Sequence, residues 1–248
     1  MIGAVCAEAE NSNDSVASKF QWQRIHIPGV GTSVLALAVH PRHPEIMLVG
    51  GYDFGIRRSE DGGKSWQPVR GLSVPMVNSI VFDPAEPERV WAATLTGPYL
   101  SEDGGKSWQP KRFGMPQAEP WSFAAPIVDL VLDELNPGRI VAFGGSRIDL
   151  LPPGTPGLGL VWESRDYGDS WTPIATIQLP EQNNGLNIRQ GGCVPEFPEL
   201  MYAVTWNHGI FTSEDSGLNW KPVNNGLPHF NITRLAFNPK NPNNLLLS

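Results

Sequence analysis

The stretch Ser59-Glu60-Asp61-Gly62-Gly63-Lys64-Ser65-Trp66 decides the fold, because it returns three more times along the chain. The copies begin at Ser101, Ser164 and Ser213, and all four share the pattern Ser-x-Asp-x-Gly-x-x-Trp. A signature that returns every ~40–60 residues is typical of a chain built from structural repeats.

Each fixed position of this motif has a structural role. The Asp carboxylate can accept hydrogen bonds from backbone N–H groups of its own turn, and the Gly permits the positive φ that a tight turn needs. The Trp brings a large apolar surface into the core. The motif is therefore interpreted as a hairpin turn and not as a catalytic site, with the structural residues Asp61, Trp66, Asp103, Trp108, Asp166, Trp171, Asp215 and Trp220.

The motif resembles the Asp-box, also called the BNR repeat, of the sialidase superfamily. This repeat occurs in sialidases, in xyloglucanase-type glycoside hydrolases, in sortilin-like receptors and in photosystem II assembly factors of the Ycf48 type. The resemblance spans about residues 20–248. It implies a β-propeller in which the boxes join the two outer strands of a blade and lie away from the binding face.

Short apolar runs surround the motifs, and the apolar period of a helix is missing throughout. The pattern predicts an all-β repeat protein: a β-propeller of four-stranded antiparallel blades, incomplete, with four full blades and partial blades at both ends. The predicted strands are 34–40, 45–50, 55–59 and 65–69; 77–83, 89–94, 98–101 and 107–111; 127–133, 139–143, 159–164 and 170–174; 192–196, 200–205, 209–213 and 219–223; and, in a half blade, 232–238 and 244–248.

The two ends of the chain are predicted to differ from the blades. Residues 1–19 are expected to form a disordered leader or the remnant of a signal peptide, and residues 20–248 the partial propeller. The first predicted strand, 20–27, corresponds to an outermost blade strand without its partners. Four full blades, a lone outer strand and half a blade are fewer than the six to eight blades usual for the family, which favours a fragment or a truncated gene. The open edges of such an arc invite self-association.

Charge and cysteine content exclude several classes of function. Lys+Arg 18 against Asp+Glu 25 gives a net charge of −7, which argues against a nucleic-acid binder. No apolar run is long enough for a transmembrane helix. Residues 1–7 resemble the end of a signal peptide and predict a secreted or cell-envelope protein. No cofactor, metal or disulfide is predicted: Cys193 is expected to be buried, and His40 and His43 belong to a turn that recurs with other residues in their place.

The irregular loops are predicted to gather on the face opposite the motifs, where long loops on a rigid scaffold usually bind ligands. Aromatic rings beside carboxylates, amides and guanidinium groups suit a carbohydrate or protein ligand. The candidate binding residues on this loop face are Tyr52, Trp121, Arg147, Asn184, Arg189, Trp206, His208 and His229, and the candidate catalytic acids are Asp53 and Asp149.

Three functions remain open. The first is a secreted or envelope scaffold that binds a glycan or protein on the loop face. The second is a glycoside hydrolase, or a fragment of one, because Tyr52-Asp53-Phe54-Gly55 resembles the Thr-Asp-Val-Gly-Gly segment that carries a catalytic Asp in xyloglucanase-type enzymes. The segment 52–55 departs from that pattern at the Thr and at the second Gly. The sialidase alternative is supported only by Arg24-Ile25-His26-Ile27-Pro28, which approximates the Arg-Ile-Pro strand of those enzymes.

The third possibility is an assembly factor of the Ycf48 type. A second acid about 5–10 Å from Asp53 would favour hydrolysis. A basic face with few carboxylates would favour a receptor or assembly role.

Overall fold

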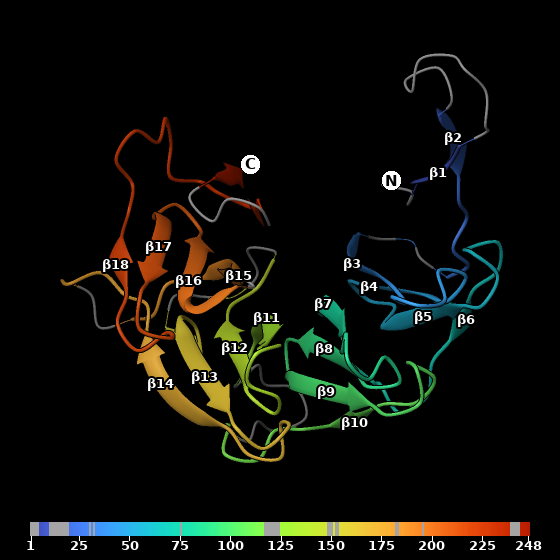
Figure 1. Ribbon diagram of the computed structural model, residues 1–248, viewed down its shortest axis with the longest axis horizontal. Helices are drawn as coiled ribbons and strands as arrows, with labels where there is room; N and C mark the ends of the chain where they lie inside the picture. The colour runs from blue at the N-terminus through green and yellow to red at the C-terminus, as the bar shows by residue number, and fades with distance from the viewer. Residues whose placement is uncertain are drawn as a thin grey trace.

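Four sheets of four antiparallel strands stand side by side in the computed structural model and form an open arc (Figure 1). Each sheet takes consecutive strands in chain order, which confirms the prediction of an all-β, incomplete propeller with four full blades. The strands are, in blade 1, β3 (Val34–Val39), β4 (Met47–Gly51), β5 (Ile56–Ser59) and β6 (Gln67–Pro68); in blade 2, β7 (Val77–Phe82), β8 (Val90–Thr94), β9 (Gly97–Ser101) and β10 (Gln109–Pro110); in blade 3, β11 (Ile127–Leu132), β12 (Ile140–Gly144), β13 (Leu160–Ser164) and β14 (Thr172–Thr176); and in blade 4, β15 (Ile188–Val194), β16 (Phe197–Thr205), β17 (Gly209–Ser213) and β18 (Lys221–Pro222).

The structure describes residues 5–9, 20–29, 31, 33–74, 76–116, 125–147, 151, 154–181, 184–194, 196–238 and 244–248. Side chains are described from residue 25 onward. Over these ranges the chain has no helix with the length and apolar character needed to cross a membrane.

The second strands of the first three blades form the centre of the core. Every residue of β4, β8 and β12 is buried. Neighbouring blades cover both faces of blades 2 and 3, and blade 1 lies between blade 2 and the segment that contains Ile25 and Ile27. Strands buried on both faces need continuous apolar runs, and this is why they were visible in the sequence. The outermost strands β6, β10 and β18 are two residues long and exposed.

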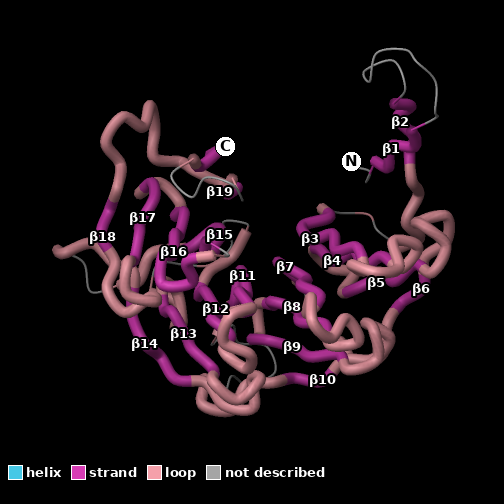
Figure 2. The backbone as a smooth tube through the Cα atoms, in the orientation of Figure 1, coloured by secondary structure: helices cyan, strands magenta, loops and turns pink. Residues whose placement is uncertain are grey.

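Two-stranded units flank the four blades and lie on opposite sides of the opening of the arc (Figure 2). β1 (Val5–Ala9) pairs with β2 (Phe20–Arg24), whereas the sequence predicts a disordered leader there and a strand without partners. The pairing supplies backbone partners that a lone strand would lack. β19 (Leu235–Phe237) pairs with β20 (Leu245–Leu247) and forms the expected half blade.

The Asp carboxylate closes the turn in each of the four motifs, at residues 59–66, 101–108, 164–171 and 213–220. In the first motif Ser65 donates to Asp61 from its backbone N (2.8 Å) and its Oγ (2.6 Å), and Ser59 Oγ donates at 2.8 Å. The bonds from Ser65, followed by the bond from Ser59, lower the pKa of Asp61 to about 2. The same bonds recur around the Asp of the other motifs.

The motif Trp residues connect each blade to the structure that precedes it. Trp108 of blade 2 packs with Leu48 and Ile56 of blade 1, and its Nε1 donates to Gly105 O of its own turn at 3.1 Å. Trp171 of blade 3 packs with Trp91 of blade 2. These two residues are buried between blades, as the sequence analysis expects.

The first and last motif Trp residues differ from this expectation. Trp66 packs against Ile25 and Ile27, which belong to the segment that precedes blade 1 in the described part of the chain. Trp220 is only partly buried, with its ring edge-on to Phe143 of blade 3 at a centroid distance of 6.1 Å.

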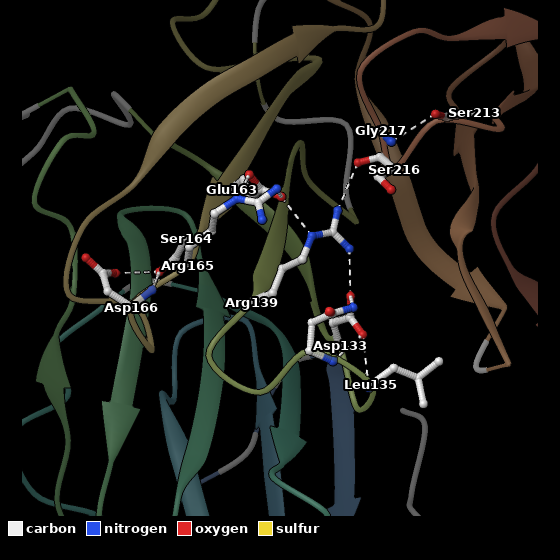
Figure 3. Close-up of polar contacts among 11 residues, drawn as sticks. Asp133, Leu135, Arg139, Glu163, Ser164, Arg165, Asp166, Ser213, Ser216 and Gly217 are labelled. Atoms are coloured by element: carbon white, nitrogen blue, oxygen red, sulfur yellow. Dashed lines mark hydrogen bonds and ion pairs between the residues drawn. The ribbon is translucent and has the colours of Figure 1, made fainter.

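A buried arginine adds a polar link between blades 3 and 4 (Figure 3). Arg139 donates to Asp133 Oδ2 at 2.9 Å and to Glu163 Oε1 at 2.7 Å within blade 3. Its remaining nitrogen, Nη2, donates to Ser216 O in the fourth motif at 3.0 Å. In the same way, Arg58 of blade 1 donates from Nε to Gly104 O of the second motif at 2.9 Å.

The turn between the first and second strands is capped by Asp in two blades and by His in blade 1. Asp83 Oδ1 accepts from Ala85 N (2.9 Å) and from Glu86 N (3.1 Å). His40 Nδ1 occupies the same position and accepts from the backbone N of Arg42 (3.1 Å) and of His43 (3.0 Å). A protonated imidazole cannot accept these bonds, so the cap requires neutral His40.

Replacing His40 by Asp is expected to weaken the pH dependence of stability. The pKa of His40 lies below its ordinary value of 6.5. Burial is the main cause, and the charges of His43 and Arg42 add to it, while Glu88 and Glu45 oppose the shift. The unfolded chain therefore takes up the proton first, and the free energy of unfolding falls as pH drops through 6.5 towards the folded pKa.

Urea titrations of the wild type and of His40→Asp between about pH 7 and pH 5 measure this difference. The exposed His26, changed to Asn, is the control that should keep the wild-type slope. An unchanged slope in His40→Asp would contradict the role of His40 as a neutral cap.

The second prediction concerns the motif Trp residues. Trp108→Ala should lower the free energy of unfolding by about 3–5 kcal/mol, because it empties a buried site between two blades. Trp220→Ala should cost clearly less, since Trp220 is only partly buried. Denaturation in guanidinium chloride compares the two variants, and equal losses would show that packing against the preceding blade is not what the Trp provides.

Candidate functional site

A β-bulge recurs near the start of the innermost strand of every full blade. The register shifts between Val34 and Ala36, Val77 and Ser79, Ile127 and Asp129, and Ile188 and Gln190. A bulge re-aims side chains and is common beside binding sites. These strand starts belong to the loop face, and the residues added there include two polar ones, Asn78 and Arg189.

Side-chain amides join the blades at this end of the strands. Asn78 of blade 2 donates from Nδ2 to Ile127 O at 2.8 Å and accepts from Arg147 N at 3.2 Å. Asn187 Oδ1 accepts from Ser146 N at 2.8 Å. The segment that follows β12 is thus held from both neighbouring blades, which positions the side chain of Arg147.

Arg147 faces a buried carboxylate of β11. Its Nη2 lies 3.6 Å from Asp129 Oδ2, and the side chains are 10% and 11% exposed. Burial raises the pKa of Asp129, although Arg147 and a hydrogen bond from Ser79 oppose this effect. Arg147 Nε is buried and has no hydrogen-bond partner among the described residues, so this guanidinium has donor capacity that the described protein leaves unused.

Two further arginines lie close to this pair. Arg189, 3% exposed, donates to Ser146 O at 3.2 Å and lies with its Cζ 3.9 Å from the centroid of the Trp206 ring. Arg234, just before β19, keeps part of its surface open to solvent. The pKa of Arg234 is lowered. Partial burial is the main cause, and the positive charges of Arg147 and Arg189 add to it, while Asp129 opposes the shift.

We name Arg147, Arg189 and Arg234 the arginine cluster. Asp129 is the carboxylate that interacts with it, so the local charge is positive although the chain as a whole carries −7. The three arginines come from blades 3 and 4 and from the half blade, and they surround the loop-face end of the innermost strands. Such a group attracts carboxylates and other anions.

The structure brings three of the sequence candidates together: Arg147, Arg189 and Trp206. His208 is close by, because its Nδ1 lies 2.7 Å from Trp206 O. Tyr52 lies elsewhere, in an apolar cluster with Met76, Leu95, Leu151 and Leu158.

The other candidates do not join the arginine cluster through any contact in the described part of the chain. Asp53 is exposed in a tight turn with φ 64°, and His229 is exposed as well. Asn184 lies beside Gly154. Trp121 and Asp149 fall outside the described residues, so Asp53 has no second acid assigned to it here.

Sequence reasoning missed Asp129 and Arg234. Asp129 interrupts the apolar run Ile127–Leu132, and a charge inside an innermost strand was the available signal. Arg234 directly precedes the short strand β19. Their significance depends on neighbours in other blades, which a linear pattern does not reveal.

Removing the charge of Asp129 is the third prediction. Asp129→Asn should lower the free energy of unfolding by about 3–5 kcal/mol, because a buried guanidinium loses its counter-charge. Added sulfate should restore part of the loss by binding at the arginine cluster. Glu214→Gln is the control, since its pair with Lys221 is 67% and 60% exposed and should contribute only about 0–1 kcal/mol. Equal losses in a thermal or urea titration would contradict the importance of the buried pair.

Comparison with solved structures places this fold beside known propellers. The crystal structure of an ancestral GH74 enzyme aligns with a TM-score of 0.67 and 21% identity, over 88% of this chain and 27% of that chain. The GH74 xyloglucanase from Xanthomonas campestris aligns with a TM-score of 0.67 and 21% identity, over 92% and 38%. The GH74 enzyme from Niastella koreensis aligns with a TM-score of 0.60 and 19% identity, over 81% and 32%.

The chain spans 27% to 38% of the length of these GH74 structures. Ycf48 bound to a D1 peptide aligns with a TM-score of 0.45 and 17% identity, over 98% of this chain and 81% of that chain. The sequence matches no protein-family model and no curated protein. At these identities the likeness to the GH74 structures shows the fold alone, and that fold is the β-propeller.

Proposed function

We propose that this chain is an Asp-box β-propeller that binds a carboxylate-bearing glycan on its loop face without cleaving it. The observation that carries the proposal is the arginine cluster. Arg147 and Asp129 form a buried pair, Arg189 adds a second guanidinium, and the charge of Arg234 is not neutralised by any ion pair among the described residues. The buried Arg147 Nε, without a partner in the described chain, adds a free donor.

The aromatic ring beside the cluster favours a sugar over a simple anion. Trp206 lies against Arg189, and a flat indole next to guanidinium donors can take the C–H face of a sugar ring while the arginines bind its carboxylate. The arginine cluster and Trp206 therefore combine positive charge with an apolar ring surface for an acidic sugar. An acidic protein segment is the competing ligand, because its carboxylates would find the same donors.

Glycoside hydrolysis is the second candidate function, and the fold likeness to the GH74 enzymes is the observation that favours it. Hydrolysis needs two carboxyl groups across the scissile bond. Asp53 is exposed in its turn and remains the proposed acid if the chain, or a longer protein that contains it, is an enzyme. The positive charge of the arginine cluster supports binding in preference to this role.

Calorimetric titration at low salt tests the proposal, with an oligogalacturonide, a neutral xyloglucan oligosaccharide and a polyglutamate peptide as probes. The oligogalacturonide should bind most tightly, and Arg234→Ala should weaken it about tenfold or more, the loss of about one charge-assisted hydrogen bond. Arg165→Ala is the control, because Arg165 is 74% exposed and belongs to the third motif on the opposite face.

Three outcomes would contradict the proposal. Preference for the polyglutamate peptide would point to a protein ligand, and equal losses from Arg234→Ala and Arg165→Ala would mean non-specific charge attraction. Release of reducing sugar from the xyloglucan oligosaccharide by the wild type, but not by Asp53→Asn, would instead support the hydrolase.

A further inference from the structure

A cavity of about 310 Å³ opens on the motif face between blades 2 and 3. Its walls are the turn after β7, the turn after β11 and Tyr167 of the third motif, and Trp91 of β8 also lines it. It lies at the opposite end of the innermost strands from the arginine cluster. The function proposed above does not use it.

Two aromatic residues distinguish this junction from the junction between blades 1 and 2. The first two motifs make the same backbone contact within their blades: Gly62 N donates to Glu45 O and Gly104 N donates to Glu88 O, both at 2.9 Å. Glu88 of blade 2 therefore corresponds to Glu45 of blade 1, and Trp91 corresponds to Leu48, since each lies three residues further on. Tyr167 stands where the first two motifs have Gly62 and Gly104, and it adopts φ 56°. A bulky residue in this backbone region costs about 1–3 kcal/mol and is enriched at functional sites. Its ring is nevertheless 46% exposed.

Trp91 carries a donor without a partner in the described chain. The residue is 0% exposed, and its Nε1 makes no hydrogen bond to any described residue. The ring lies so close to Gly168 that a Cβ there would be 2.2 Å from it. The indole N–H of the third motif tryptophan therefore has a different partner. Trp171 Nε1 donates to Lys111 O at 3.0 Å, whereas the Nε1 atoms of the other three motif tryptophans donate to a Gly carbonyl of their own turns.

Charged side chains complete the cavity with both acceptors and donors. Arg89 lies with its Cζ 4.8 Å from the centroid of the Tyr167 ring and is held by Asp83 at 3.2 Å and by Glu86 at 2.8 Å. On the opposite wall Asp133 accepts from Arg139 at 2.9 Å. Guanidinium groups and carboxylates therefore both line the cavity beside an aromatic ring.

We propose that this cavity binds a neutral sugar ring. Sugar hydroxyls both donate and accept, so they can bind the carboxylates and the arginines at once, while the C–H face packs on the half-exposed ring of Tyr167. An anion would meet four lining carboxylates against two arginines. An organic cation would suit the carboxylates but would be repelled by Arg89 and Arg139.

The experiment is a titration of ¹⁵N-labelled protein followed by NMR of the indole N–H signals, with Trp91→Phe used to assign the Trp91 signal. The probes are methyl β-glucoside and methyl β-galactoside, and acetylarginine amide represents a cation. One glycoside should shift the Trp91 signal to saturation with a dissociation constant of about 1–10 mM, the weak range for a single ring with few contacts.

Tyr167→Gly is the decisive variant, because it restores the residue found in the first two motifs and should keep the fold, as unchanged signals of the other tryptophans would verify. It should weaken binding at least tenfold. Arg234→Ala, at the other end of the strands, should leave the titration unchanged. No saturable shift with either glycoside, a shift with acetylarginine amide alone, or full affinity in Tyr167→Gly would each overturn the proposal.

Discussion

One carboxylate in each motif turn holds the outer half of a blade in place. The Asp accepts hydrogen bonds from residues four positions later, and the turn that results presents a Trp to the preceding part of the chain. Local backbone geometry and contact between blades therefore depend on the same eight residues. This arrangement explains why an outermost strand such as β6 can be two residues long and exposed, since the turn beside it provides the attachment.

The fold could be predicted because its determinants are local. The motif marks the end of each third strand, and the fully buried strands β4, β8 and β12 are apolar throughout. What the sequence did not reveal depends on contacts between distant residues. Trp171 is redirected by Trp91, which lies in another blade, and the ribbon of β1 and β2 depends on pairing across residues 10–19.

The candidate site was only partly predictable for the same reason. Arg147, Arg189 and Trp206 were found as loop-face residues, because polar and aromatic side chains in irregular loops are visible in the sequence. Their convergence on Asp129 follows from the bulges and the amide bridges of Asn78 and Asn187, which join different blades. The two ends of the innermost strands thereby acquire opposite character: guanidinium groups predominate at one, and carboxylates outnumber them at the other.

The open arc has a consequence for how the molecule unfolds. Among the described residues, blades 2 and 3 have a four-stranded blade on both sides, whereas blades 1 and 4 have one on a single side. In a row of units held by nearest neighbours, structure is lost from the ends inward. We therefore expect the four blades to unfold in more than one step: blades 1 and 4 open first, and blades 2 and 3 open most slowly.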